Sequence, residues 1–296
     1  MSATDLLTPR AAALVKELEF FARARVEGFL KSNNRSKRKG QSTEFMQHRQ
    51  YMPGDDLRSL DWRVFARSDR LVTREYEEHT TLDVVIGLDA SGSMGYGTLE
   101  LNKIEFCRRC AAMLCYLLMG QRDAFGLTIL RDRIAQYVRP QSSRKHLVEV
   151  LRQLVEAQPT GPTDFAAGVE QLLNQVRRRS VFVFFSDCYQ DPEPLSKALG
   201  MLAVRGHDVV LYQVYDPAEA ELPFAGFTLF RDLEGQGLDA VDPLEIRQAY
   251  RDVFAAHTLS LKDGTSRFGI EFHSTPVSTD WDDVLAGLLR QRSRLR

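Results

Sequence analysis

The sequence predicts an α/β fold in which a mainly parallel sheet lies between layers of helices. After residue 80, short apolar runs rich in β-branched and aromatic residues alternate with helical patterns. The runs are continuously apolar, which is typical of strands buried on both faces and therefore of parallel sheets. The composition, 44% hydrophobic and 27% charged residues, is that of a globular protein, and it excludes mostly disordered, collagen-like and disulfide-scaffold chains.

The chain is expected to open with a helix. Its apolar positions recur at helical spacing, at Leu14, Leu18, Phe21 and Phe29. Pro9 stands near the predicted start, and serine and asparagine end the pattern at residues 32–34. The basic run at 35–39 that follows is expected to be a solvated loop, with phosphate or partner binding as the alternative.

A polar segment from Glu44 to Glu78 comes next and is expected to form a small, β-containing extension. Pro53 and Gly54 predict a turn, and a strand is expected over 71–76. The segment is denser in charged and aromatic groups than a linker requires. We expect these groups to form either a docking face or a structural brace, and they are Arg49, Tyr51, Asp55, Asp56, Arg58, Asp61 and Trp62.

The chain is accordingly divided into an extension, residues 1–80, and an α/β domain, residues 81–296. Strands of that domain are expected at 82–88, 125–130, 181–185, 209–214 and 270–272. Helices are expected at about 103–120, 143–156, 164–178, 193–205, 244–262 and 281–292. Gly120 and Gly206 stand where two of these helices should end.

Four cysteines are present, and three of them fall in one predicted helix, as expected for buried thiols of a reducing compartment. Cys107-x-x-Cys110 also suggests zinc or redox chemistry. Zinc needs further ligands at suitable spacing, and a redox pair usually stands at a helix start, so buried core is the favoured interpretation. The longest apolar run is ten residues, at 110–119, which is too short to span a membrane, and the first residues lack a signal pattern. A soluble cytoplasmic protein is expected.

Oxygen-bearing side chains follow three of the predicted strands. Asp89-x-Ser91-x-Ser93 ends the first, and Thr163 and Asp187 stand at equivalent strand ends. Ligand sites of open α/β sheets lie beyond the carboxyl ends of the strands. Two carboxylates and three hydroxyls suit a hard cation such as Mg²⁺, or Mn²⁺. Because three of the five donors are neutral, the ion would stay electrophilic toward an incoming carboxylate.

This constellation resembles the metal-ion-dependent adhesion site (MIDAS) of von Willebrand factor type A domains, and the element order from 82 to 292 is similar to that three-layer, Rossmann-like fold. The segment around Arg49-x-Tyr51-x-Pro53-Gly54-Asp55-Asp56-x-Arg58-x-Leu60-Asp61-Trp62 resembles the signature of the domain of unknown function 58 (DUF58) family. The resemblance implies that Ser91, Ser93 and Thr163 bind the metal through hydroxyls, and Asp89 and Asp187 directly or through water. It also implies a MoxR-type AAA+ ATPase as partner, in protein remodelling or complex assembly. The chain carries no phosphate-binding loop of its own.

Other interpretations predict different chemistry. Asp89, Ser91 and Ser93 could merely cap a turn and a helix start, and Asp164 is better explained as a helix N-terminal residue. A metal-dependent hydrolase could use Asp89 as nucleophile, but Ser91 stands where such enzymes carry a second acid.

A metal-independent binding module could use the basic run at 35–39 together with an arginine-rich tail, Arg290, Arg292, Arg294 and Arg296. The net charge of −1 gives no reason to expect nucleic-acid binding. The favoured prediction is a non-enzymatic adaptor in which an Asp or Glu of a partner completes the coordination of the metal.

Overall fold

The computed structural model describes residues 9–34, 47–51, 62–68, 71–75, 83–235 and 237–294. They fall into two compact units, one formed by Met1–Lys31 with Leu82–Arg296 and the other by Ser32–Thr81. The expected division at residue 80 assigned the first helix to the extension, whereas the structure groups most of that helix with the large unit.

A six-stranded sheet in the order β10-β7-β6-β3-β4-β5 forms the centre of the large unit. Five strands run parallel, and they are β3 (Asp83–Asp89), β4 (Ala124–Leu130), β6 (Val181–Ser186), β7 (Asp208–Tyr215) and β10 (Glu271–Pro276). The sixth, β5 (Ile134–Gln141), is an antiparallel edge strand that the sequence analysis missed. The central strands β3 and β6 are almost completely buried, as their apolar runs predicted.

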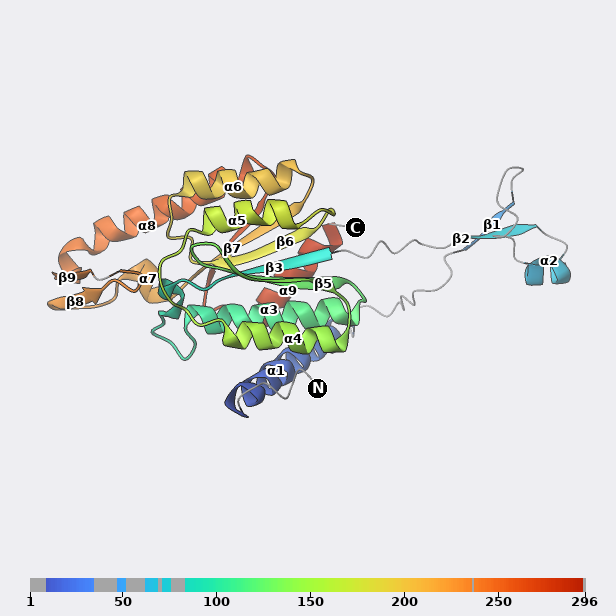
Figure 1. The fold of residues 1–296 in the computed structure, drawn as a ribbon, viewed down its shortest axis with the longest axis horizontal. Helices are drawn as coiled ribbons and strands as arrows, with labels where there is room; N and C mark the ends of the chain where they lie inside the picture. Colours follow the sequence, from blue (N-terminus) through green and yellow to red (C-terminus); the bar gives the residue numbers. More distant parts are fainter. Residues whose placement is uncertain are drawn as a thin grey trace. The chain divides into compact units, whose positions relative to one another are not determined.

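Helices cover both faces of this sheet and make three layers (Figure 1). One face carries α1 (Pro9–Asn34), α3 (Lys103–Gly120), α4 (Arg144–Glu156) and α9 (Trp281–Arg294). The other face carries α5 (Phe165–Gln175), α6 (Pro192–Val204) and α8 (Pro243–Ser266). The predicted α/β fold class is confirmed, and the expected helices match to within a few residues.

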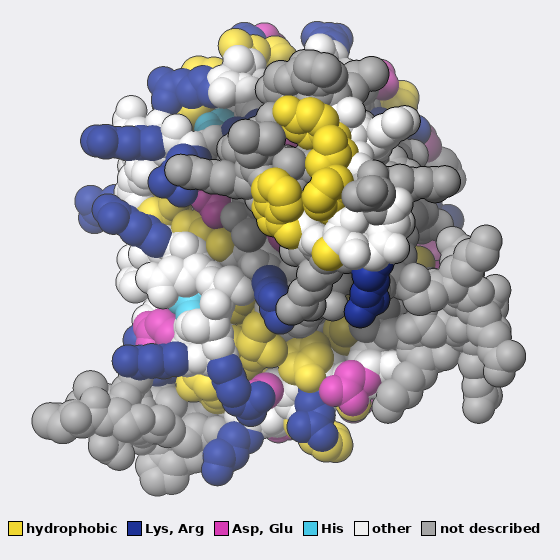
Figure 2. Space-filling model, turned by 90° about the vertical axis from the view of Figure 1, so that its right-hand side faces the viewer, with side chains coloured by type: hydrophobic (Ala, Val, Ile, Leu, Met, Phe, Trp, Pro, Cys, Tyr) yellow, Lys and Arg dark blue, Asp and Glu magenta, His cyan; other side chains and the backbone are white. Residues whose placement is uncertain are grey.

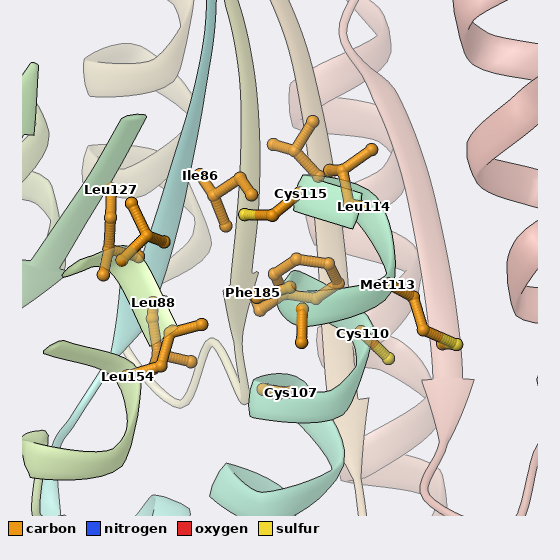
Figure 3. Packing of buried hydrophobic residues seen from close by; sticks show 14 of the residues in the cluster. Ile86, Leu88, Cys107, Cys110, Met113, Leu114, Cys115, Leu127, Leu154 and Phe185 are labelled. Atoms are coloured by element: carbon orange, nitrogen blue, oxygen red, sulfur yellow. The ribbon is translucent and has the colours of Figure 1, made fainter. Parts of the chain in front are cut away.

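The core beneath α3 contains three of the cysteines. Figure 3 shows Ile86, Leu88 and Phe185 of the sheet facing the helix that carries Cys107 and Cys110. All four cysteines are free and buried, and burial raises the pKa of the Cys110 thiol. The prediction that they belong to the core is confirmed.

The small unit contains a two-stranded sheet and a short helix. β1 (Gln47–Gln50) pairs antiparallel with β2 (Val72–Glu75), and α2 (Trp62–Ser68) lies between them in sequence. Of the proposed docking or bracing residues, Arg49 lies in β1, Tyr51 follows it, and Trp62 begins α2 with its indole largely exposed. The other proposed residues lie outside the described residues, and they are Asp55, Asp56, Arg58 and Asp61. The predicted turn and the basic run at 35–39 also lie outside them.

A segment between β7 and α8 was also missed by the sequence analysis. It contains α7 (Pro217–Glu221) and a hairpin of β8 (Thr228–Arg231) and β9 (Leu238–Val241). Across the described ranges, none of the helices combines the length and the apolar character needed to cross a membrane.

Candidate metal site

The carboxyl ends of β3 and β6 bring the two predicted carboxylates together. The strands are parallel neighbours, with Leu88 paired to Phe185, so Asp89 and Asp187 leave the sheet at the same edge. Both side chains are buried. The hydroxyl of Ser186, the residue before Asp187, donates a hydrogen bond to Oδ2 of Asp89 at 2.6 Å. Adjacent strand ends therefore place two buried acids at the same edge of the sheet.

The two serines of the Asp-x-Ser-x-Ser motif join this group. The backbone N–H of Ser91 donates to Oδ1 of Asp89 at 2.9 Å. Ser91 and Ser93 share a hydrogen bond between their hydroxyls at 3.0 Å. The 3-10 helix η3 (Gly92–Gly95) starts within the motif and turns both hydroxyls to the same side. The two-residue spacing of the motif is thus enough to bring the side chains of Asp89, Ser91 and Ser93 together.

The loop of Thr163 lies against the motif, but the Thr163 hydroxyl does not join the other four predicted ligands. The backbone N–H of Gly92 donates to the carbonyl of Gly161 at 2.8 Å, and that of Thr160 donates to the carbonyl of Ala90 at 3.1 Å. The Thr163 hydroxyl donates to the carbonyl of Arg131 at 3.2 Å. The structure thus holds the loop of Thr163 against the motif but directs the Thr163 hydroxyl to the end of β4.

Asp164 caps α5, as predicted: its side chain accepts a hydrogen bond from the backbone N–H of Ala167 at 2.9 Å.

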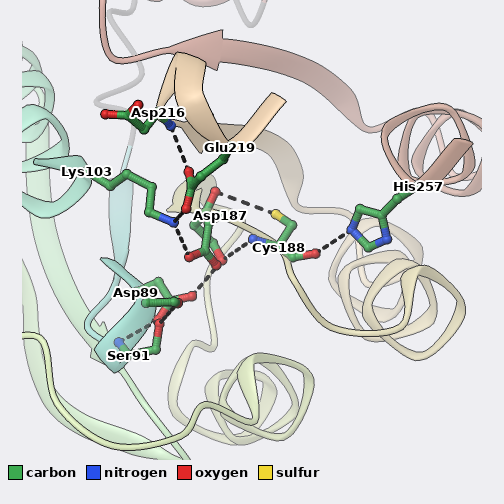
Figure 4. Close-up of polar contacts among 10 residues, drawn as sticks. Asp89, Ser91, Lys103, Asp187, Cys188, Asp216, Glu219 and His257 are labelled. Carbon is green, nitrogen blue, oxygen red and sulfur yellow. Dashed lines mark hydrogen bonds and ion pairs between the residues drawn. The ribbon is translucent and has the colours of Figure 1, made fainter. Parts of the chain in front are cut away.

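A lysine that the sequence analysis overlooked lies at the centre of the cluster. Lys103 is buried, and its Nζ donates to Oδ2 of Asp187 at 2.8 Å and to Oε1 of Glu219 at 2.6 Å (Figure 4). Its ammonium also lies 4.7 Å from the ring centroid of Tyr189. One signal was available in the sequence: a lysine in the first turn of a helix opposes the helix dipole and needs acidic neighbours.

The electrostatics of the cluster favour an additional cation. Burial, and after it the charge of Asp187, raises the pKa of Asp89 to about 7. Burial raises the pKa of Glu219, against the opposing effect of Lys103. Burial also works against the charge of Lys103, but Asp187 and Glu219 outweigh it and raise the pKa of the ammonium. Asp187 and Glu219 therefore share one ammonium, Asp89 lies beside Asp187 without a cation of its own, and the excess negative charge suits a divalent ion.

The donor set itself is chemically consistent with such an ion. Buried carboxylates and hydroxyls are the hard oxygen ligands that Mg²⁺ and Mn²⁺ prefer. Within the part of the chain that the structure describes, no three His, Cys, Asp or Glu side chains are grouped so that they could hold a metal. The predicted set contains only two carboxylates and otherwise hydroxyls, so its residues fit Mg²⁺ and do not fit a zinc site.

Comparisons with known proteins agree with this architecture. A family model described as "Protein of unknown function DUF58" matches residues 47–260. Uncharacterized proteins of Mycobacterium tuberculosis and Mycobacterium bovis are 28% identical over 294 residues, which is 97% of this chain and 90% of each relative. An aerotolerance-related membrane protein of Bacteroides fragilis superposes with a TM-score of 0.51 at 15% identity, over 73% of this chain and 100% of that one. The VWA domain of SpRpn10 superposes with a TM-score of 0.42 at 14% identity, over 72% of this chain and 95% of that one.

Proposed function

Since the chain belongs to the DUF58 family and has a three-layer α/β fold, we propose that it is a non-enzymatic protein-binding adaptor that depends on a divalent cation, as its resemblance to von Willebrand factor type A domains implies. The observation that carries the proposal is the cluster of Asp89, Ser91, Ser93 and Asp187, whose negative charge exceeds what Lys103 neutralises. Mg²⁺ or Mn²⁺ is the ion that these ligands suit.

Each residue of the cluster has a distinct part in this proposal. Ser91 and Ser93 supply neutral oxygens, and Asp89 and Asp187 supply charge directly or through water. Thr163 joins them when its hydroxyl gives up the bond to Arg131. A bound divalent ion supplies Lewis acidity toward a carboxylate, and an Asp or Glu of the partner protein is the group that we expect to bind there.

A MoxR-type AAA+ ATPase is the partner that we propose, in protein remodelling or complex assembly. This part rests on the resemblance of the segment around Arg49 and Trp62 to the DUF58 signature and on the family match. Affinity capture from cell extract with Mg²⁺ or with a chelator tests it. We expect the ATPase to be retained only with Mg²⁺, and equal retention under both conditions would contradict the metal-dependent mechanism.

Two alternatives have less support. Asp89 is buried and accepts hydrogen bonds at both oxygens, which is a poor environment for a nucleophile. The basic run at 35–39 lies outside the described residues. On the face shown in Figure 2, lysine and arginine side chains of the described residues stand among hydrophobic and acidic ones. Within the described residues, we therefore find less support for a metal-independent module that binds through basic groups than for the metal site.

Isothermal titration with Mg²⁺ tests the metal site directly. We expect the wild type to bind one ion and Asp89→Ala to lose that binding, because the aspartate anchors the motif. Asp191→Asn is the matched control, since Asp191 is an exposed acid that caps α6 close to the site in sequence. Equal binding by wild type and Asp89→Ala would refute the proposed site.

A further inference from the structure

The segment between β7 and α8 is anchored at its root by groups close to the metal site. Asp216 accepts hydrogen bonds from the backbone N–H of Thr98 at 2.7 Å and from its hydroxyl at 2.6 Å. Glu219, which completes a capping box with Asp216, bonds Lys103 and through it Asp187. Arg247 of α8 holds the other side of the root by donating to the carbonyl of Leu222 at 3.0 Å. The root is therefore fixed without help from the hairpin.

The tip of the β8–β9 hairpin lies on the Asp-x-Ser-x-Ser loop. A methyl group added to Gly92, between the two ligand serines, would overlap the backbone carbonyl oxygen of Leu233. Asp232 shapes this tip by accepting from the backbone N–H of Glu234 at 2.8 Å. Gly92 thus provides the space in which the carbonyl of Leu233 rests, next to the backbone that carries Ser91 and Ser93.

The strands of the hairpin contribute little burial of their own. Leu229 and Leu238 are exposed, and Phe227, which precedes β8, is 82% exposed. A two-stranded hairpin without a core is marginally stable in water. Its position consequently depends on the anchored root and on the contact of its tip with Gly92.

We propose that the β8–β9 hairpin is a displaceable cap on the metal site, which restricts access to the ion until a partner moves it. This inference rests on the proposed function. The root that carries the hairpin also holds Glu219 against Lys103, so the fixed base of the cap lies next to the ion pair of Asp187. The exposed apolar side chains of the hairpin are the part of the cap that a partner can bind.

Amide hydrogen exchange of the metal-free protein tests the contact between the hairpin tip and Gly92. Gly92→Ala should unseat the tip and speed amide exchange over 228–241 by about tenfold or more. Gly95→Ala is the matched control, because its added methyl group meets only the side chain of Pro159, at 3.2 Å. Unchanged exchange of the hairpin in Gly92→Ala would overturn the inference.

A second variant leaves the metal loop intact and tests access to the ion. Thr228 and Val241 are paired across the hairpin, so Leu229–Ala240 can be replaced by Asn-Gly, the residues of a two-residue turn. With Mn²⁺ as the probe, we expect the shortened variant to bind the ion with an affinity within about threefold of wild type, because all the ligands are kept. We also expect the bound ion to relax solvent water protons faster in this variant, because the cap no longer restricts access of water to it. Equal relaxation by the two proteins would overturn the cap. Failure of both proteins to bind Mn²⁺ would refute the proposed function, while the exchange experiment would still decide whether the tip is seated.

Discussion

Lys103 shows how a single residue can be stable in an environment that its chemistry opposes. It is the first residue of α3, where the helix dipole disfavours a positive charge, and it is buried. Hydrogen bonds to Asp187 and Glu219 compensate for both costs. The lysine also restrains Asp187, so it acts as a positioning residue for the proposed metal ligand.

Replacement of Lys103 by methionine is expected to lower the free energy of unfolding by about 3–5 kcal/mol, because it leaves the buried carboxylate of Asp187 and the half-buried carboxylate of Glu219 without their cation. Lys197→Met is the control. Lys197 pairs with Glu193 at 2.6 Å on the surface of α6, and loss of such an exposed pair costs at most about 1 kcal/mol. Urea unfolding of both variants measures the difference, and similar losses would show that Lys103 does not stabilise the acids.

At the scale of elements, α1 shows how a helix at the start of the predicted extension packs with the large unit. Ala22 and Val26 are buried against the large unit, and the ring of Phe21 meets Trp281 of α9 edge-on at 5.1 Å. Trp281 in turn stacks on Phe106 of α3 at 5.1 Å. The apolar stripe of α1 needed a partner, and the sequence does not say that this partner lies more than two hundred residues away.

Alanine substitutions at two neighbouring phenylalanines of α1 distinguish the effect of this packing on stability from the effect of helix propensity. Phe21→Ala is expected to destabilise the fold by about 2–3 kcal/mol because it removes an aromatic contact and leaves a cavity. Phe20→Ala, at a side chain that is 69% exposed, should change stability by less than about 0.5 kcal/mol. Denaturant unfolding followed by tryptophan fluorescence checks both, and equal effects would contradict the docking of α1.

The missed strands have a common physical origin. β5 is an edge strand of mixed composition that includes Arg139 and Pro140, and β8 and β9 are short, with mostly exposed side chains. A strand that is open to water on a face or edge does not need the continuous apolar run by which β3 and β6 were recognised. Pairing with neighbours, which is a tertiary property, makes these segments strands.

At the scale of the whole molecule, the proposed metal site is expected to link stability to pH. The pKa of Asp89 in the folded, ion-free protein is about 7, well above that of an unfolded chain. The folded state therefore keeps a proton that the unfolded state releases. The free energy of unfolding should fall as pH rises from about 4 to about 7, because the unfolded state binds fewer protons over that range.

A divalent ion is expected to reverse this loss. Mg²⁺ competes with the proton on Asp89, so the rise in melting temperature on adding Mg²⁺ should be larger at pH 8 than at pH 6. An excess of Mg²⁺ one hundred times its dissociation constant would stabilise the fold by about 2.7 kcal/mol. Scanning calorimetry with Mg²⁺ or chelator measures the effect. Asp89→Asn should melt higher than wild type in chelator at pH 8 and should not respond to Mg²⁺, and a response equal to that of wild type would exclude Asp89 as a ligand.

The extent to which the site could be predicted depends on how its members are separated along the chain. Asp89, Ser91 and Ser93 lie within one turn, and Asp187 follows the adjacent parallel strand, so strand pairing alone brings them together. Lys103 and Glu219 belong to α3 and α7, whose orientation no local pattern determines. The direction of the Thr163 hydroxyl toward Arg131 was likewise not predictable.

Local pattern was therefore enough for the buried parallel strands, for most helices and for the acids and serines at the strand ends, because burial and short-range spacing dictate them. Packing between distant segments decided the rest: the docking of α1 on α9, the ion pairs of Lys103 and the seat of the hairpin tip on Gly92. Such contacts depend on shape and charge complementarity in three dimensions, and residue order along one segment carries no record of them.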